Sequence, residues 1–507
     1  MASSDYETTL YSDESNISKT KWHASDSDTA TEESPARGHT SLLREVPFIV
    51  TICMSQMLAL SGIGQGLAPL YVVGESFGIT NQGYLSWYMA AFSLTVGTFV
   101  LPAGRLGDMY GHKRIFLVGS IWYGIWSLVC GFCVYSSSVL FSVSRCFQGI
   151  GPALMVPNSL AIAGRSFQGK KKNYVFALFG ASAPAGAVLG GVFSAILTQY
   201  IWWPWTYWVM GMILFAYTAL SFWVLPPDEY DPQTEKSELT FDFAGTITGV
   251  TGLILFNFAW NQAGVVGWTV PYTYTLLIVG ILFFGAFIYV EKHVAKFPLV
   301  PINMLSEEAV YALSIIACGW ASFGIWVFYL WQLIMYLRQH SILAAAAQQA
   351  PAAVSGLLAS LTVAYLFSKL NVAYFMVAAM VSFLTGQVLL STVPVSQTYW
   401  GQTFLSLVIM AWGMNMTFPA GTIILSNGMP REHQGIAASL IVTVVNYSIS
   451  ISLGIASTIV RQTREKGISR LETYRNVWYF AIGLDGLGVL IALYFLWIKV
   501  VRRKSAC

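Results

Sequence analysis

Long apolar stretches separated by short polar segments dominate the chain from Val46 to Lys499. Each stretch holds about 20 residues, and a helix of that length crosses a hydrocarbon core about 30 Å thick. No stretch alternates apolar and polar residues with the period of two that a membrane β-barrel requires. The pattern predicts an all-α polytopic membrane protein with about 14 transmembrane helices, at residues 46–68, 84–103, 115–134, 138–164, 174–200, 205–225, 243–263, 271–291, 310–335, 347–367, 372–392, 402–427, 434–460 and 477–499.

The composition agrees with this pattern, since 55% of the residues are hydrophobic and only 10% are charged. A soluble domain carries about 25% charged residues. The mean hydropathy of +0.60 likewise indicates that most of the chain lies in the membrane. No loop between the spans is long enough to form a soluble catalytic domain, which argues against a membrane-attached enzyme.

Basic residues gather in alternate loops, and cytoplasmic loops of membrane proteins carry an excess of Lys and Arg. The loops after the predicted spans 2, 4, 6, 8, 10 and 12 contain basic residues, whereas those after spans 1, 3, 5, 7 and 11 contain none. Both termini are therefore expected on the cytoplasmic side. The outer loop after span 13 departs most from the rule, so either a late loop tolerates the departure or the last two spans are misplaced. That loop carries Arg461, Arg464, Lys466, Arg470 and Arg475.

Three polar segments lie outside the spans. Residues 1–45 are acidic, rich in Ser and Thr and poor in apolar side chains compared with the rest of the chain. Such a segment cannot bury enough surface to offset the entropy lost on ordering. We therefore expect a disordered cytoplasmic tail at residues 1–45, a cytoplasmic linker at residues 226–242 and a basic cytoplasmic tail at residues 500–507.

Two charged side chains lie away from the ends of the predicted spans, Arg145 in the fourth and Asp485 in the fourteenth. Charged groups in a membrane are costly and often functional, although a structural hydrogen bond or a snorkelling side chain is the alternative for each. Arg145 precedes residues rich in Gly, Pro and polar groups, whereas Asp485 has no polar neighbour in the sequence. No span contains a histidine, so no metal or cofactor site is expected and an enzyme is disfavoured.

The loop after the second span reads GRLGDMYGHKR and combines one carboxylate with basic side chains and glycines. Such a loop permits a tight backbone reversal and a charge network. Alternatively, its basic residues only fix the orientation of the neighbouring spans in the membrane. The sequence here resembles the major facilitator superfamily, whose signature in this loop is G-x-x-x-D-x-x-G followed by two basic residues. In that family the motif gates the cytoplasmic side, which implies a gating role for Gly104, Asp108, Gly111, Lys113 and Arg114.

Two further segments resemble motifs of the same family, in the same order. RCFQGIGPA lies in the fourth span and GASAPAGAVLGG in the fifth, where Ala183 replaces the glycine that usually precedes the proline. Small residues at a spacing of four allow close helix packing and a proline bends a helix, which suits a two-state gate or static packing. The motif residues are Arg145, Gln148, Gly149 and Gly151 in the fourth span and Gly180, Pro184, Gly186, Gly190 and Gly191 in the fifth.

The number of spans indicates a branch of this superfamily. The seventh span begins FDFAGTITGVTGLILF, which resembles the fourteen-span drug:proton antiporter group. The thirteenth resembles fungal aminotriazole and boron exporters and low-affinity ammonium transporters. The resemblance implies the major facilitator fold and alternating access, with six-helix halves at residues 46–225 and 310–499 and two inserted helices at residues 243–291.

The resemblance and the scarcity of charge favour proton-coupled efflux of a small organic compound. Transport of borate or ammonium and a transport-inactive sensor are the alternatives. We expect a monomer in the lipid bilayer of the plasma membrane, or of the vacuole, with a small molecule and protons as partners and no nucleic acid. Polar side chains at mid-depth are candidates for the substrate cavity, although interhelical hydrogen bonding also explains each one. They are Gln56, Asn158, Gln332, Asn415 and Asn446.

Overall fold

The computed structural model describes residues 42–79, 81–167, 169–228, 241–296, 298–300, 302, 305–367, 369–428 and 434–502. Within these residues, 14 helices are long and apolar enough to cross a membrane, which confirms the all-α prediction. Of the disordered tail expected at residues 1–45, residues 1–41 lie outside the described part, as do most of the linker and the last five residues, whereas residues 42–45 form the start of α1. The helices of the first half are α1 (Leu42–Leu67), α3 (Gln82–Tyr110), α4 (His112–Phe132), α5 (Ser138–Ser166), α6 (Gly169–Tyr200) and α7 (Pro204–Val224).

The remaining long helices follow the predicted order closely, and side-chain caps begin several of them. Ser306 accepts a hydrogen bond from the backbone N–H of Ala309, and Ser341 accepts one from Ala344, each at 3.2 Å. Such caps satisfy N–H groups that have no partner within the helix. These helices are α8 (Phe243–Val266), α9 (Pro271–His293), α10 (Glu307–Gln332), α11 (Ile342–Leu366), α12 (Val372–Thr392), α13 (Gln402–Asn427), α14 (Gln434–Glu465) and α15 (Arg470–Leu496), and a short helix, α2 (Leu70–Ser76), follows α1.

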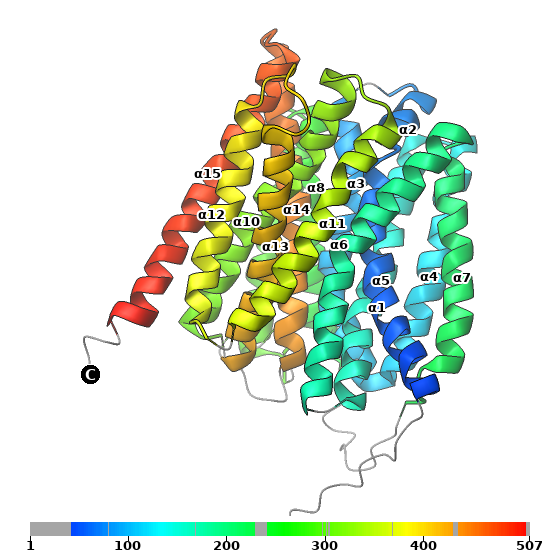
Figure 1. Cartoon of the computed structure of the whole chain (residues 1–507), viewed down its shortest axis with the longest axis vertical. Coiled ribbons are helices and arrows are strands. Elements are labelled where there is room, and N and C mark those ends of the chain that lie inside the picture. The colour runs from blue at the N-terminus through cyan, green and yellow to red at the C-terminus, as the bar shows by residue number, and fades with distance from the viewer. Residues whose placement is uncertain are drawn as a thin grey trace, which may run out of the picture.

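The long helices form one bundle of two parts that meet along two seams (Figure 1). In the first part α1 packs on α6, α4 on α5 and α7, and α3 on α5. In the second part α12 packs on α13 and α15, α10 on α15, and α11 on α13. One seam joins α3 to α14 and the other joins α6 to α11. We call the end at which α1 begins the predicted cytoplasmic end, following the charge pattern.

The pair α8 and α9 lies outside the first seam, because α8 packs against both α3 and α14. Ser450 of α14 ties these three helices together. Its hydroxyl lies 2.8 Å from the carbonyl oxygen of Ala90 in α3 and 3.0 Å from Oδ1 of Asn257 in α8. The amide of Asn261 donates to the carbonyl oxygen of Ser450 at 3.2 Å. The inserted pair therefore covers the seam on its outer side.

The basic segment at the other end of the bundle has partners in the protein. Arg461 pairs with Glu465 at 2.9 Å and donates to the carbonyl oxygen of Val265 at 2.5 Å. The guanidinium of Arg470 lies 4.7 Å from the centre of the Tyr336 ring. Because α14 and α15 occur where we expected the last two spans, misplaced spans do not explain this basic loop.

Candidate substrate cavity and gate

A cavity of about 1050 Å³ lies between the two parts of the bundle. Helices α1, α3, α5 and α6 line it on one side, and α10, α11, α13 and α14 line it on the other. Among the described lining residues none is Asp, Glu, Lys, Arg or His. Ten aromatic side chains contribute to the described wall, and an apolar wall of this kind binds neutral or weakly ionised organic molecules. They include Phe92, Trp320, Phe323, Trp326 and Trp331.

The cavity extends toward the predicted cytoplasmic end. Its wall reaches Tyr174 near the start of α6 and Phe367 just after α11, and the side chain of Tyr174 is 70% exposed. At the opposite end the two parts touch. The backbone N–H of Leu343 in α11 donates to Oε1 of Gln199 in α6 at 3.0 Å, and the rings of Tyr71 and Tyr336 lie 4.0 Å apart.

Three of the five candidate cavity residues, Gln56, Asn415 and Asn446, line this cavity. The hydroxyl of Ser360 donates to Oδ1 of Asn415 at 2.8 Å. Gln349 of α11 also lines the cavity, and sequence reasoning missed it because it lies at the edge of an alanine-rich predicted span.

Two amides in the cavity wall retain unused hydrogen-bonding capacity. Oε1 of Gln56 and Nε2 of Gln349 are buried and have no hydrogen-bond partner among the described residues. A buried polar atom without a partner is costly, so a ligand that supplies the missing partner binds more tightly. Gln56 offers an acceptor to such a ligand and Gln349 offers a donor.

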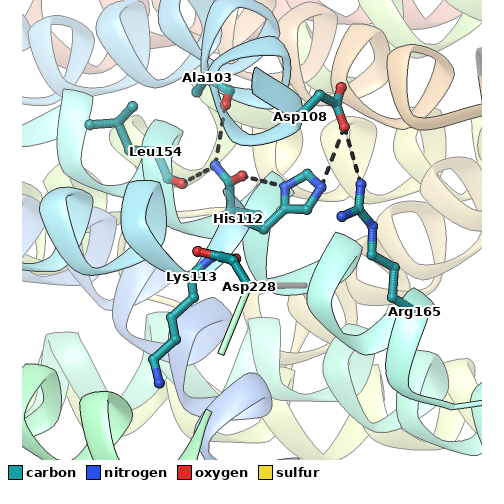
Figure 2. Close-up of polar contacts among 8 residues, drawn as sticks. Ala103, Asp108, His112, Lys113, Leu154, Arg165 and Asp228 are labelled. Atoms are coloured by element: carbon teal, nitrogen blue, oxygen red, sulfur yellow. Dashed lines mark hydrogen bonds and ion pairs between the residues drawn. The ribbon is translucent and has the colours of Figure 1, made fainter. Parts of the chain in front are cut away.

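The other two candidates, Asn158 and Gln332, do not line the cavity, because each is engaged elsewhere. Oδ1 of Asn158 lies 2.7 Å from Nδ1 of His112, and its amide donates to the carbonyl oxygens of Ala103 and Leu154 (Figure 2). Oε1 of Gln332 accepts a hydrogen bond from the Tyr474 hydroxyl at 2.7 Å. These amides fit the interhelical alternative that the sequence left open.

The gating motif occupies the end of α3 and the start of α4. Oδ1 of Asp108 lies 3.3 Å from Nε2 of His112 and 3.6 Å from Nη2 of Arg165 (Figure 2). Gly111 between the helices has φ of 98°, a conformation that favours glycine. Asn158 thus holds one side of the buried His112 ring and Asp108 the other, so the motif is joined to the interior of α5.

Asp228, which follows α7, completes this site and was missed by sequence reasoning. Its Oδ1 accepts from the backbone N–H of Lys113 at 2.8 Å, and its Oδ2 accepts from that of Arg114 at 3.3 Å. Lys113 Nζ in turn donates to the carbonyl oxygen of Leu225 at 2.6 Å. Gly111 is the residue that precedes α4, and glycine has no side chain that could cap the helix. This glycine was the one indication in the sequence that a residue from elsewhere in the chain caps α4.

We expect Asp228→Ala to destabilise the protein by about 1 kcal/mol, because it leaves two N–H groups at the start of α4 without their acceptor and removes a favourable charge from that helix end. Thermal unfolding of the purified protein in detergent measures this loss. The unfolding temperature of Asp228→Asn, which keeps one acceptor oxygen but no charge, should lie between those of the native protein and Asp228→Ala. An unfolding temperature of Asp228→Ala equal to that of the native protein would contradict the capping role.

Arg145 lies behind the cavity wall and is fully buried. Its Nε donates to the carbonyl oxygen of Tyr88 at 3.0 Å, and its Nη2 donates to that of Gly62 at 2.8 Å. Nη1 donates to Oε1 of Gln148 in the next turn. The guanidinium carbon also lies 4.6 Å from the centre of the Phe92 ring, which lines the cavity. Arg145 therefore joins α1, α3 and α5 without entering the cavity.

The small residues of the two span motifs divide into two groups. Gly180, Pro184 and Gly191 line the cavity. The others face neighbouring helices so closely that a Cβ atom would collide with backbone or side-chain atoms. These are Gly186, against Met57, Gly190, against Ser61, Gly149, against Phe92, and Gly151, against Tyr123.

Asp485 lies inside the bundle and is fully buried. The hydroxyl of Ser322 in α10 donates to its Oδ2 at 2.7 Å. The sequence around Asp485 showed no polar neighbour because this partner is remote along the chain. The contact fits the structural alternative that we considered for Asp485.

Comparison with known proteins supports the resemblance. A family model described as the Major Facilitator Superfamily matches residues 48–453. A low affinity ammonium transporter of Saccharomyces cerevisiae is 51% identical over 472 residues, which cover 92% of this chain and 91% of that protein. The efflux pump terJ of Aspergillus terreus is 43% identical over 470 residues, which cover 92% of this chain and 90% of that protein.

Solved structures share the fold. The POT family transporter PepTSo has a TM-score of 0.62 at 15% identity, and the match covers 90% of this chain and 97% of that chain. Such low identity supports the fold alone. The matched family and relatives are transporters rather than enzymes, and the chain is a multi-pass membrane protein. The predicted resemblance is thereby confirmed, and the chain belongs to the Major Facilitator Superfamily.

Proposed function

We propose that this transporter exports a small, neutral or weakly ionised organic compound from the cytoplasm by proton-coupled alternating access. The observation that carries the proposal is the aromatic cavity, which has no charged side chain among its described lining residues and extends toward the predicted cytoplasmic end. The name of the relative from Aspergillus terreus, an efflux pump, agrees with this direction. We further propose that the protein works as a monomer in the plasma membrane.

The motif loop serves as the gate in this proposal. Gly104 and the beginning of α14 lie close together, since a Cβ atom at Gly104 would be 3.4 Å from Oγ of Ser439. Rocking of the two parts about the cavity changes this contact. Asp108 joins the end of α3 to His112 at the start of α4, and the backbone N–H groups of Lys113 and Arg114 join that start to Asp228 after α7. With Gly111 at the turn, these contacts keep the ends of the three helices together during that motion.

Transport of ammonium is the second candidate, because the yeast relative that is 51% identical bears that name. Aromatic rings attract cations, and three tryptophans line the cavity. However, a cation site usually includes an anionic partner, and the described cavity wall offers none. The organic substrate is therefore the first choice.

A fungal host without its own exporters, grown on azoles, other organic toxins, borate and methylammonium at two external pH values, tests the proposal. Expression should raise resistance to an organic toxin, and this resistance should weaken at high external pH. Improved growth on limiting ammonium without any resistance would contradict the export proposal and favour uptake.

Gln349→Leu should lower the resistance to that toxin by about fivefold or more, because it removes the free donor from the cavity wall. The matched control is Gln387→Leu in α12, a buried amide that does not line the cavity. Dose–response curves at equal membrane levels of the two variants measure the difference. Equal resistance in both variants would remove Gln349 from the substrate site.

A further inference from the structure

Two acidic side chains meet where the inserted helices approach the predicted cytoplasmic end. Asp242 precedes α8, and its Oδ1 accepts a hydrogen bond from the backbone N–H of Gly245 at 2.8 Å. Glu291 lies in the last turn of α9 and is only 4% exposed. Its Oε2 accepts from the backbone N–H of Val300 at 3.2 Å. One oxygen of each carboxyl group is thus held by the backbone.

The second oxygen of each group has no such partner. Oδ2 of Asp242 and Oε1 of Glu291 are both buried, and neither has a hydrogen-bond partner among the described residues. Both oxygens face Gly245: a Cβ atom there would lie 2.8 Å from the Glu291 oxygen and closer still to the Asp242 oxygen. The two oxygens are therefore within about 5 Å of each other.

The described charged neighbours of the pair lie in the last turn of α9, in the segment after it and at the end of α3. Lys292, His293 and Lys296 lie near Glu291 along the chain, and Arg105 and Asp108 lie at the end of α3. In the described part of the chain none of Lys292, Lys296 and His293 forms an ion pair with Asp242 or Glu291, and Asp108 pairs with His112 and Arg165. The ring of His293 stacks on Tyr289 instead, and α14 carries no charged residue in the described stretch before Arg461.

Two carboxylates this close, each with one buried and unpaired oxygen, repel each other, and such a pair can retain a proton that isolated carboxylates release. We propose that Asp242 and Glu291 share one proton, with the protonated oxygen of one donating to the free oxygen of the other. The pair is then a proton-binding site outside the substrate cavity. Its ligand is the cytoplasmic proton, and the inference does not depend on which substrate the protein carries.

The position of the pair suggests what the proton does. The shared proton joins the start of α8, the end of α9 and the backbone at Val300, which leads to α10. Because α8 packs on both α3 and α14, loosening its base alters the seam along which the two parts of the bundle move. Loss of the proton at alkaline cytoplasmic pH leaves two adjacent anions and weakens this anchor.

Thermal unfolding of the purified full-length protein in detergent, from about pH 6 to about pH 9, tests the proposal. The native state retains a proton that the unfolded chain releases, so the unfolding temperature should fall as the pH rises. The Gln side chain in Glu291→Gln donates the same hydrogen bond but does not titrate. The decrease in unfolding temperature between about pH 6 and about pH 9 should therefore be smaller in this variant than in the native protein, by about 3 °C or more. The matched control is Glu307→Gln, an exposed carboxyl group at the start of α10, which should keep the native pH dependence.

A second variant and a second measurement keep the test decisive. Asp242→Asn retains the acceptor for Gly245 and should give the same reduced pH dependence, even where Glu291→Gln fails to fold. The infrared band of a protonated carboxyl group should weaken at neutral pH in either variant and persist in Glu307→Gln. Native pH dependence and an unchanged band in both variants would overturn the proposal. So would stabilisation of the native protein by sodium, potassium, magnesium or calcium chloride that both variants lose, because the pair would then bind a metal cation.

Discussion

Arg145→Lys should lower the rate of transport by at least about tenfold, a larger effect than any single change in the cavity wall. The guanidinium donates to the carbonyl oxygens of Tyr88 and Gly62 and to the amide of Gln148, and so it joins three helices. Lysine keeps the charge but is a compact ammonium that cannot reproduce a planar fork of donors. Two buried acceptors then lose their partner, at a cost of about 1–3 kcal/mol each.

Initial rates in proteoliposomes with a substrate identified by the growth panel measure this loss, at equal amounts of inserted protein. Arg464→Lys is the matched control, because Arg464 is exposed in the last turn of α14 and should tolerate the change. Gly66→Ala offers an independent test, since its methyl group would lie 2.6 Å from Nη2 of Arg145 and should displace the guanidinium. A native rate for Arg145→Lys would mean that a positive charge alone is sufficient at this position.

The sequence predicted the number and order of the spans because each span is a long apolar stretch that lipid alone selects. It also singled out Arg145, since a charge within a span must find partners. Asn158 and Gln332 were assigned to the cavity incorrectly because mid-depth polarity does not reveal which face of a helix meets the cavity. The hydrogen-bond partners that engage Asn158 and Gln332 away from the cavity are His112 and Tyr474, and both belong to other helices.

The same reasoning explains what was missed. Asp228 caps α4 from a linker that is 115 residues away in sequence from Lys113, so no local pattern revealed it. Gln349 follows four alanines and another glutamine, and only the packing of α11 turns it into the cavity. The contacts of the motif loop and the lining of the cavity depend on which residues of distant helices become neighbours. The apolar period of a single helix carries little of that information.

Gly190→Ala should destabilise the protein by about 1–3 kcal/mol and lower transport, because α6 and α1 touch through their backbones at this point. A Cβ atom at Gly190 would lie 2.6 Å from Cα of Ser61, and one at Gly186 would lie 2.7 Å from Cα of Met57. Backbone atoms cannot swing away as a flexible side chain does, so the added methyl group must separate the two helices. Thermal unfolding in detergent and the transport rate measure the two effects.

Gly180→Ala is the matched control for stability, since it lies on the same helix and in the same motif but has no atom within 4 Å of its Cβ position. It should unfold at or above the native temperature, because alanine favours a helix over glycine by about 1 kcal/mol. Gly285→Ala in α9, also in open space, is the control for transport because it does not line the cavity. Equal unfolding temperatures for Gly190→Ala and Gly180→Ala would contradict the close packing of α1 and α6.

The transport loss in Gly190→Ala has a specific cause in this structure. Helix α6 also carries Pro184, which lines the cavity and faces Gly356 of α11: a Cβ atom at Gly356 would lie 3.1 Å from Cγ of Pro184. Displacing α6 from α1 therefore shifts the seam between α6 and α11 as well as the cavity wall. A variant that loses stability but keeps its transport rate would mean that α6 is a static support, and the motif would then serve packing rather than gating.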